Sequence, residues 1–308
     1  MRDRPHSIQH GLHDSSTRPC NSGERRCAVG FAHKIPPGAT VRLADYDPDE
    51  HAGLEKADAI ERTARLGAEL GELEDLLYAA GRHAVLVVFQ GRDTSGKDGA
   101  IRHLLSHVNA QSCRVAAFKV PTPQKLAHDF LWRVHKETPP LGGMTIFNRS
   151  HYEDVLVVRV RRLAPPTVWR PRYARICEFE RLLTDAGTLV LKFLLHISRE
   201  EQEERLLARE QDPAKFWKLS VDDWKERERW DDYTRAYEEM LSRTSTKHAP
   251  WLLVPANRKW FRDLAVTEAV VQALRPLRAG WLESLRETGE RELKEIREYR
   301  AGRCGGAR

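Results

Sequence analysis

The sequence predicts an α/β fold in which a parallel, five-stranded sheet is covered by helices on both faces. Short apolar runs suited to buried strands alternate with stretches whose apolar residues recur at helical spacing. This alternation is typical of parallel sheets, because two parallel strands need a crossover connection between them. Hydrophobic residues make up 41% and charged residues 31% of the 308 positions, which fits a soluble protein with one sizeable core.

The elements can be placed in chain order. A helical pattern over residues 55–81 stops at Gly81, and the helix expected over 125–136 is ended by Pro139 and Pro140. Strands are expected over 84–90, 114–120, 144–150, 188–198 and 251–256. The remaining helices are expected over 97–108, 152–163 and 259–274. No internal repeat is present, so the chain holds one copy of this module.

Three further segments complete the domain prediction. Residues 1–33 are rich in Ser, Arg, His, Gly and Pro and are interpreted as a disordered tail. Residues 34–280 form the α/β domain, and 281–308 a C-terminal helix and a loose tail. Within the domain, residues 199–241 carry too many charges for a core segment and are interpreted as a helical lid inserted between strands.

Charge and cysteine content limit the classes of partner and compartment. The net charge of +6 fits a polyanionic partner without choosing among nucleic acid, nucleotide and polyphosphate. No apolar run reaches the roughly 20 residues that span a bilayer, and the N-terminus lacks a secretory apolar stretch. The five cysteines are interpreted as reduced thiols of a cytoplasmic protein, with a zinc or redox pair at Cys20 and Cys27 as the alternative.

A phosphate-binding loop is predicted where the first strand ends. Gly91, Gly96 and Lys97 have Gly-x-x-x-x-Gly-Lys spacing between a strand and a helix. Asp98 stands where Ser or Thr usually follows the lysine, and Asp93 lies inside the loop. A carboxylate beside phosphate is repelled unless a divalent ion lies between them, so Asp93 predicts bound Mg²⁺, with Mn²⁺ as an alternative. Asp98 is interpreted as an acid favoured by the helix dipole.

A second group of polar residues ends the third strand. Arg149 could bridge the phosphates of two substrates, because active sites in parallel sheets lie at the carboxyl ends of the strands. Glu153 has two interpretations that stay open here: a metal ligand, or the acid of a capping box with Ser150.

The charged segment offers a third group. Arg209, Lys215 and Lys218 flank a break at Asp212-Pro213, where a lid would turn toward the phosphates. Trp217, Trp224 and Trp230 of the same segment are interpreted as packing residues.

Six segments together resemble the polyphosphate kinase 2 family. They read FQGRDTSGKDGAIRH, FKVPTPQKLAHDFLWRVH, IFNRSHYEDVLVVRV, LKFLLHISREEQEERL, DPAKFWKLS and APWLLVPANRKW. The resemblance runs from about residue 33 to 275 and implies a thymidylate-kinase-like P-loop kinase fold. It also implies Mg²⁺-dependent phosphoryl transfer between inorganic polyphosphate and a nucleotide. With Asn148 where one subgroup has Asp, the chain is similar to single-module class III members, which act on nucleoside mono- and diphosphates.

The resemblance assigns roles by position. Asp93 matches the metal-linked loop aspartate, Lys97 the loop lysine, Arg149 the arginine of the second motif and Arg209 the lid arginine that reaches the transferring phosphates. Because Asn148 lacks a metal-binding carboxylate, Glu153 would partly replace it.

The resemblance also implies the reaction and the partners. The expected reaction moves the terminal phosphoryl group of polyphosphate to ADP and to AMP, with guanine nucleotides as an alternative. The expected protein is a homo-oligomer, a dimer or tetramer, without nucleic acid or membrane partners. Two rivals stay open: an ATP-dependent nucleoside monophosphate kinase, and a non-catalytic polyanion-binding protein.

Overall fold

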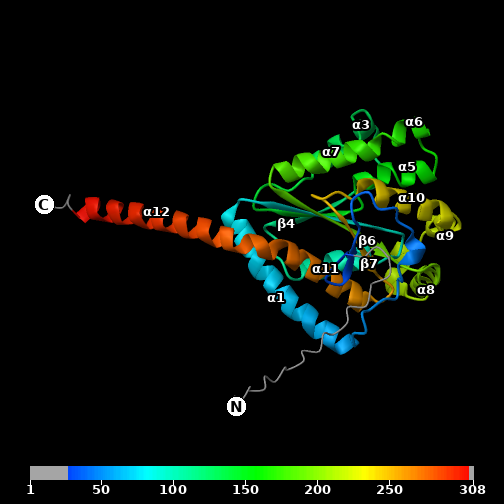
Figure 1. Cartoon of the computed structure of the whole chain (residues 1–308), viewed down its shortest axis with the longest axis horizontal. Helices are drawn as coiled ribbons and strands as arrows, with labels where there is room; N and C mark the ends of the chain where they lie inside the picture. The colour runs from blue at the N-terminus through cyan, green and yellow to red at the C-terminus, as the bar shows by residue number, and fades with distance from the viewer. Residues whose placement is uncertain (1–26, 305–308) are drawn as a thin grey trace, which may run out of the picture.

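The computed structural model describes residues 27–304 and contains a seven-stranded mixed sheet (Figure 1). The strands are β1 (Cys27–Val29), β2 (Ala32–Lys34), β3 (Ala84–Gly91), β4 (Cys113–Ala117), β5 (Met144–Asn148), β6 (Thr188–His196) and β7 (Trp251–Pro255). Their order is β1-β2-β7-β6-β3-β5-β4. The run from β7 to β4 is parallel throughout, which confirms the predicted five-stranded parallel sheet.

Helices connect and cover these strands. The longer ones are α1 (Lys56–Ala80), α2 (Lys97–Leu105), α7 (Arg172–Asp185), α8 (Arg199–Glu210), α9 (Val221–Glu228), α10 (Trp230–Thr244), α11 (Lys259–Leu274) and α12 (Arg278–Cys304). The short ones are α3 (Pro123–Leu126), α4 (Trp132–His135), α5 (Val157–Val160) and α6 (Pro166–Trp169). The 3-10 turns are η1 (Leu43–Asp45), η2 (His151–Asp154), η3 (Pro213–Lys218) and η4 (Arg275–Leu277).

Two apolar layers lie on opposite faces of the sheet. In β3, Val85 and Val87 point into the layer that contains α1, α2 and α11, while Leu86 and Val88 point into the layer that contains α7 and α10. All four side chains are fully buried, because successive residues of a strand face opposite sides and both sides are covered. β3 lies in the interior of the sheet, so the loop that follows it is held by both layers.

The structure differs from the predicted tail at residues 27–33. β1 and β2 form an antiparallel hairpin through Gly30, and His33 of β2 pairs with Leu253 of β7. Periodicity could not predict this hairpin, because two three-residue strands at a sheet edge depend on backbone hydrogen bonds rather than on an apolar pattern. Residues 1–26, including Cys20, lie outside the described part of the chain.

Two predicted helices are broken in the structure. The segment 152–163 contains the end of η2 and the single turn α5, and 125–136 contains only the end of α3 and α4. At the C-terminus, the predicted helix is present as α12, which starts at Arg278 and runs out from the body (Figure 1). None of the helices among residues 27–304 combines the length and apolarity needed to cross a membrane.

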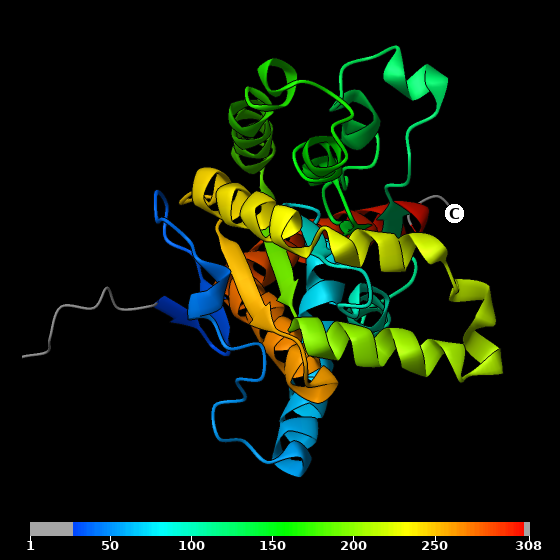
Figure 2. The ribbon, with the colours of Figure 1, turned by 90° about the vertical axis from the view of Figure 1, so that its right-hand side faces the viewer.

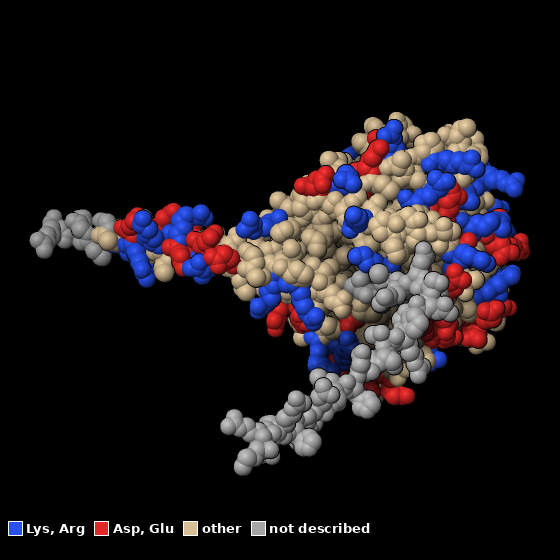
Figure 3. All heavy atoms as spheres, viewed as in Figure 1, with Lys and Arg blue, Asp and Glu red and all other residues tan. Residues whose placement is uncertain are grey.

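The charged segment 199–241 divides into two parts. Figure 2 shows α8 leaving the sheet, the chain reversing through η3, and α9 and α10 returning beside it. The expectation that the whole segment stays outside the core is wrong for α10, because Tyr237, Met240 and Leu241 are buried in the α7 layer. Basic and acidic side chains interleave along the edge of the body where α8 and α9 lie (Figure 3). The lid is therefore α8, η3 and α9.

Candidate active site

The chain turns from β3 into α2 through a loop that requires glycine at two positions. Gly91 has a φ of 151° and Gly96 a φ of 97°. A Cβ atom on Gly91 would lie 2.8 Å from the carbonyl oxygen of Leu195, and one on Gly96 would lie 2.2 Å from a guanidinium nitrogen of Arg262. Both glycines are thus needed for the close-packed course that the Gly-x-x-x-x-Gly-Lys spacing predicts.

Lys97 curls back over this loop. Its side chain is buried, and Nζ donates hydrogen bonds to the carbonyl oxygens of Gly91 (2.7 Å) and Arg92 (2.9 Å). Burial, helped by the charge of Arg149, lowers the pKa of Lys97 to about 8, although Asp93 acts against this shift. A buried ammonium group held only by neutral carbonyls would bind an entering phosphate strongly, because an anion compensates its charge.

Two hydroxyl groups of the loop are buried without a partner. Within the described residues, Thr94 Oγ1 and Ser95 Oγ make no hydrogen bond, and the two residues are 9% and 0% exposed. Thr94 also has a left-handed backbone, with a φ of 64°. Buried polar atoms normally find partners, and a ligand with polar atoms in this loop would supply them.

Arg149 lies opposite the loop and contacts both predicted metal ligands. Its Nη2 lies 2.5 Å from Asp93 Oδ1, and its Nη1 lies 3.5 Å from Glu153 Oε2. Burial would lower the pKa of Arg149, but the carboxylates of Glu153 and Asp93 raise it above its ordinary value. Burial raises the pKa of Glu153, against the charges of Arg149 and Lys97. Ser150 is the N-cap of η2, but its Oγ accepts from the backbone N–H of Tyr152 rather than from that of Glu153, and the Glu153 carboxylate faces Arg149.

Asp98 joins the loop to the second motif and to the lid. Asn148 Nδ2 donates to Asp98 Oδ1 at 2.9 Å, and Lys218 Nζ donates to Asp98 Oδ2 at 3.2 Å. Burial alone would raise the pKa of Asp98, but these two hydrogen bonds lower it overall. The carboxylate lies in the first turn of α2, as its interpretation as a helix-dipole residue requires. Through its contact with Lys218, it also holds η3 near the loop.

The other two predicted lid residues differ in their positions. Arg209 Nη1 lies 3.2 Å from Asp223 Oδ2, and the pKa of Asp223 is raised by burial and by the charge of Asp93. Arg209 is therefore paired within the lid, with Asp223 of α9, and is not among the residues that line the pocket described below. Lys215 instead pairs with Asp212 within its own turn, at 2.5 Å, and the structure does not bring it to the loop.

Sequence reasoning missed two side chains that attach α8 to the loop. Gln202 Nε2 donates to the Asp93 carbonyl at 3.2 Å, and Arg205 Nη1 donates to the Thr94 carbonyl at 2.8 Å. Arg205 also donates to the Ala256 carbonyl after β7, at 2.7 Å. The available signal was the position of Arg205 one helical turn before Arg209, which places both on one face of α8.

Three aromatic residues of α10, Trp230, Tyr233 and Tyr237, form a wall beside the loop. They face the charged group of Asp93, Arg149 and Glu153. The guanidinium of Arg92 lies 3.6 Å from the ring centre of Trp230 and donates to Thr234 Oγ1 at 2.5 Å. A pocket opens between the loop and this wall, lined among others by Asp93, Arg149, Glu153, Trp230, Tyr233 and Tyr237. Trp230 thus lines the site besides packing, whereas Trp217 is 78% exposed and is not a packing residue.

Comparison with known proteins decides the family of this site. The sequence profile of Polyphosphate kinase 2 (PPK2) matches residues 53–278, which include the loop, the second motif and the lid. The chain belongs to the polyphosphate kinase 2 family. It is an enzyme, a phosphotransferase with the P-loop kinase fold.

Relatives and a solved structure agree with this assignment. The chain is 49% identical over 247 residues to an AMP/ADP-polyphosphate phosphotransferase of Meiothermus ruber, covering 80% of this chain and 92% of that protein. It is 40% identical over 284 residues to an ADP-polyphosphate phosphotransferase of Rhodopseudomonas palustris, covering 88% and 96%. The crystal structure of Polyphosphate Kinase 2 from Arthrobacter aurescens matches with a TM-score of 0.77 and 41% identity, over 79% of this chain and 88% of that one.

Proposed function

We propose that this kinase transfers the terminal phosphoryl group of inorganic polyphosphate to ADP and to AMP. The observation that carries the proposal is the convergence of Lys97 and Arg149 on a loop with unpartnered buried hydroxyls. These groups suit phosphate chains, which carry many negative charges and accept hydrogen bonds along their length.

The proposed reaction is an in-line exchange between phosphates. An oxygen of the acceptor's terminal phosphate forms a new bond to the last phosphorus of polyphosphate, while the bridging P–O bond to that phosphorus breaks. The shortened polyphosphate leaves with the electron pair. The attacking oxygen is already ionised at neutral pH, so no general base is required. Catalysis then consists of positioning and charge neutralisation.

Each site residue has a proposed part in this exchange. The backbone of Gly91 to Gly96 surrounds one phosphate chain, and Lys97 leaves its carbonyl partners to bind that chain. Arg149 reaches across to the second substrate, and Arg209 closes over the transferring group from the lid. Lys218 holds the lid to the loop through Asp98, which also orients Asn148. Lys215 would bind polyphosphate only further out, since it is half exposed.

The carboxylates of Asp93 and Glu153 fit a Mg²⁺ ion, with Mn²⁺ as an alternative. Both contact the guanidinium of Arg149, so a cation can replace that contact when phosphate arrives. Among residues 27–304, no group of three or more His, Cys, Asp or Glu side chains could hold a metal by itself. A bound ion would therefore take ligands from phosphate oxygens and water, as Mg²⁺ usually does, and would neutralise phosphate charge.

The acceptor and the setting are also proposals. The relative at 49% identity is named for both AMP and ADP, which supports both acceptors here. A GDP-polyphosphate phosphotransferase of Pseudomonas aeruginosa at 31% identity keeps guanine nucleotides as an alternative. Free Cys113 and Cys177 support a reducing, cytoplasmic setting. A homo-oligomer remains our prediction for the assembly.

The donor is tested by supplying AMP with long-chain polyphosphate in one reaction and with ATP in another, each with Mg²⁺. Products are separated by ion-exchange chromatography. The proposal predicts ADP, followed by ATP, from polyphosphate. If ADP forms only when ATP is the donor, the protein is a nucleoside monophosphate kinase. If polyphosphate binds without any product, the protein is a polyanion-binding protein.

A further inference from the structure

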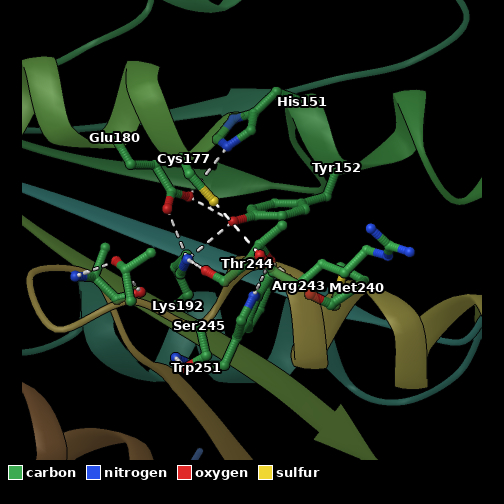
Figure 4. Close-up of polar contacts among 12 residues, drawn as sticks. His151, Tyr152, Cys177, Glu180, Lys192, Met240, Arg243, Thr244, Ser245 and Trp251 are labelled. Carbon is green, nitrogen blue, oxygen red and sulfur yellow. Dashed lines mark hydrogen bonds and ion pairs between the residues drawn. The ribbon is translucent and has the colours of Figure 1, made fainter. Parts of the chain in front are cut away.

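A cluster of buried polar side chains joins η2, the turn that follows β5, to α7, β6 and α10 (Figure 4). Lys192 Nζ donates hydrogen bonds to Glu180 Oε2 (2.7 Å), to Tyr152 Oη (2.9 Å) and to the Thr244 carbonyl oxygen (2.8 Å). Tyr152 in turn donates its hydroxyl to Glu180 Oε1 at 2.6 Å. His151 Nε2 lies 3.4 Å from the same carboxylate oxygen. All five residues are 0% exposed.

Stability alone does not explain an ion pair at this position. Removing two charges from water carries a large desolvation cost, and apolar residues of similar volume often give equal or greater stability. Lys192 lies on β6 between apolar neighbours, where such a residue would fit. The compensation is also complete, since the ammonium group has three acceptors and both oxygens of Glu180 accept hydrogen bonds. The ion pair is therefore fully hydrogen-bonded, although Nδ1 of the neighbouring His151 has no partner among the described residues. A satisfied network of this kind fixes Lys192, Glu180 and Tyr152 in one arrangement.

Tyr152, which the cluster fixes, lies three residues after Arg149, whose backbone is strained. Arg149 has a left-handed backbone with a φ of 62°, which is unfavourable for a residue other than glycine. Such a conformation persists only where the surrounding structure imposes it. On one side of Arg149, its N–H donates to the Phe89 carbonyl at 3.1 Å. On the other side, Ser150 Oγ accepts from Gln90 Nε2 and Tyr152 is locked into the cluster.

The direction of the guanidinium depends on this backbone. From this left-handed backbone, Nη2 of Arg149 reaches Asp93 Oδ1 at 2.5 Å. A shift of Tyr152 would break its hydrogen bonds to both Glu180 and Lys192, so these contacts restrict the turn between Arg149 and Tyr152. None of the five cluster residues lines the pocket, so the cluster acts on the reaction through the elements that it joins. One is the turn that carries Arg149, and the other is α10, which the Lys192 hydrogen bond to the Thr244 carbonyl holds.

We propose that Tyr152, Glu180 and Lys192 are positioning residues that hold Arg149 in its strained conformation and so aim its guanidinium at the reacting phosphates. The inference rests on the proposed function, in which Arg149 contacts those phosphates. Positions that must be held to within a fraction of an ångström commonly depend on such supporting residues, and a misplacement of about 1 Å can cost up to 100-fold in rate.

Tyr152→Phe is the most conservative test, because it removes one hydroxyl and keeps the ring. Tyr173→Phe is the matched control: Tyr173 is a buried tyrosine of the same apolar layer, and its hydroxyl contacts Arg159 rather than the cluster. With polyphosphate and ADP, Tyr152→Phe is expected to lower kcat about tenfold at a temperature where the protein stays folded. Tyr173→Phe is expected to change kcat less than twofold.

A double-mutant cycle separates positioning from general packing. If the cluster acts through Arg149, the Tyr152→Phe change loses its effect in an Arg149→Ala background, where it should alter kcat less than twofold. An equal loss in both backgrounds, or no loss in either, would overturn the proposal. The paired change Glu180→Gln with Lys192→Met removes both charges together and should repeat the loss if Tyr152→Phe proves insoluble.

Binding gives a readout that needs no turnover. Isothermal titration of each variant with tripolyphosphate should show about threefold weaker binding for Tyr152→Phe than for the wild type, and no such difference between Arg149→Ala proteins with and without that change. An inactive wild-type protein would contradict the proposed function, yet this binding comparison would still decide the role of the cluster. Equal tripolyphosphate affinities of the wild type and Tyr152→Phe would contradict that role.

Discussion

Replacing Arg149 by lysine tests the geometry of the site most sharply. The change keeps the positive charge but removes the two parallel N–H donors of the guanidinium. In the structure, Nη2 and Nη1 of Arg149 reach Asp93 and Glu153 separately. A single ammonium group cannot hold two phosphate oxygens in the same bidentate arrangement. Losing one charge-assisted hydrogen bond in the transition state costs about 1.5–3 kcal/mol, which corresponds to a fall in kcat of about 10- to 150-fold.

The assay is ATP formation from ADP and polyphosphate, measured with luciferase under saturating substrates. Thermal unfolding followed by circular dichroism shows whether the variant stays folded. Arg159→Lys is the matched control, since Arg159 is also half-buried and paired with a carboxylate, Glu239, but lies outside the pocket. It should stay within twofold of the wild type. An Arg149→Lys protein within threefold of the wild type would refute the bidentate role of Arg149.

Three further predictions follow from the loop. Asp93→Asn removes a proposed metal ligand and should raise the Mg²⁺ concentration for half-maximal rate about tenfold; an unchanged Mg²⁺ titration would contradict its metal role. Because the pKa of Lys97 is lowered to about 8, the affinity for tripolyphosphate should fall as the pH rises through 8, where the ammonium loses its proton. Lys97→Met should flatten that titration curve. Gly96→Ala would place a Cβ 2.2 Å from a guanidinium nitrogen of Arg262, at a φ that alanine rarely adopts. Urea denaturation should therefore show a free energy of unfolding lower by more than about 1 kcal/mol. Unchanged stability would contradict the need for glycine at this position.

Local pattern predicted the elements that hold the loop. β3 is found at 84–91 and α1 ends before Gly81, because buried strands and glycine-terminated helices leave signals in consecutive residues. The hairpin of β1 and β2 left no such signal, since it depends on its partner β7. The core position of α10 did leave a signal, since Tyr233, Tyr237 and Leu241 recur at helical spacing along it. The high charge of the segment 199–241 outweighed that signal in the prediction.

The site was predictable in composition but less so in its contacts. Asp93, Lys97, Arg149 and Glu153 come together as strand ends of a parallel sheet must, although their roles stay predictions. The contacts of Gln202 and Arg205 with the loop depend on the angle at which α8 leaves the sheet, which the sequence does not state.

The buried cluster left one signal that was available. Lys192 interrupts the apolar run of β6, and a lysine in a buried strand needs a partner. That signal indicated neither Glu180 nor Tyr152, because the three side chains come from a strand, a helix and a turn that meet only in the folded protein.

Phosphorus-31 NMR of one reaction, containing ADP, long-chain polyphosphate and Mg²⁺, tests the central claim most directly. For the wild type, the γ-phosphate signal of ATP should grow by as much as the polyphosphate signal declines, with no orthophosphate formed. The Arg149→Ala protein should show both changes roughly 100-fold more slowly. If polyphosphate is converted to orthophosphate, or if Arg149→Ala transfers at the wild-type rate, direct phosphoryl transfer organised by the loop and Arg149 is contradicted.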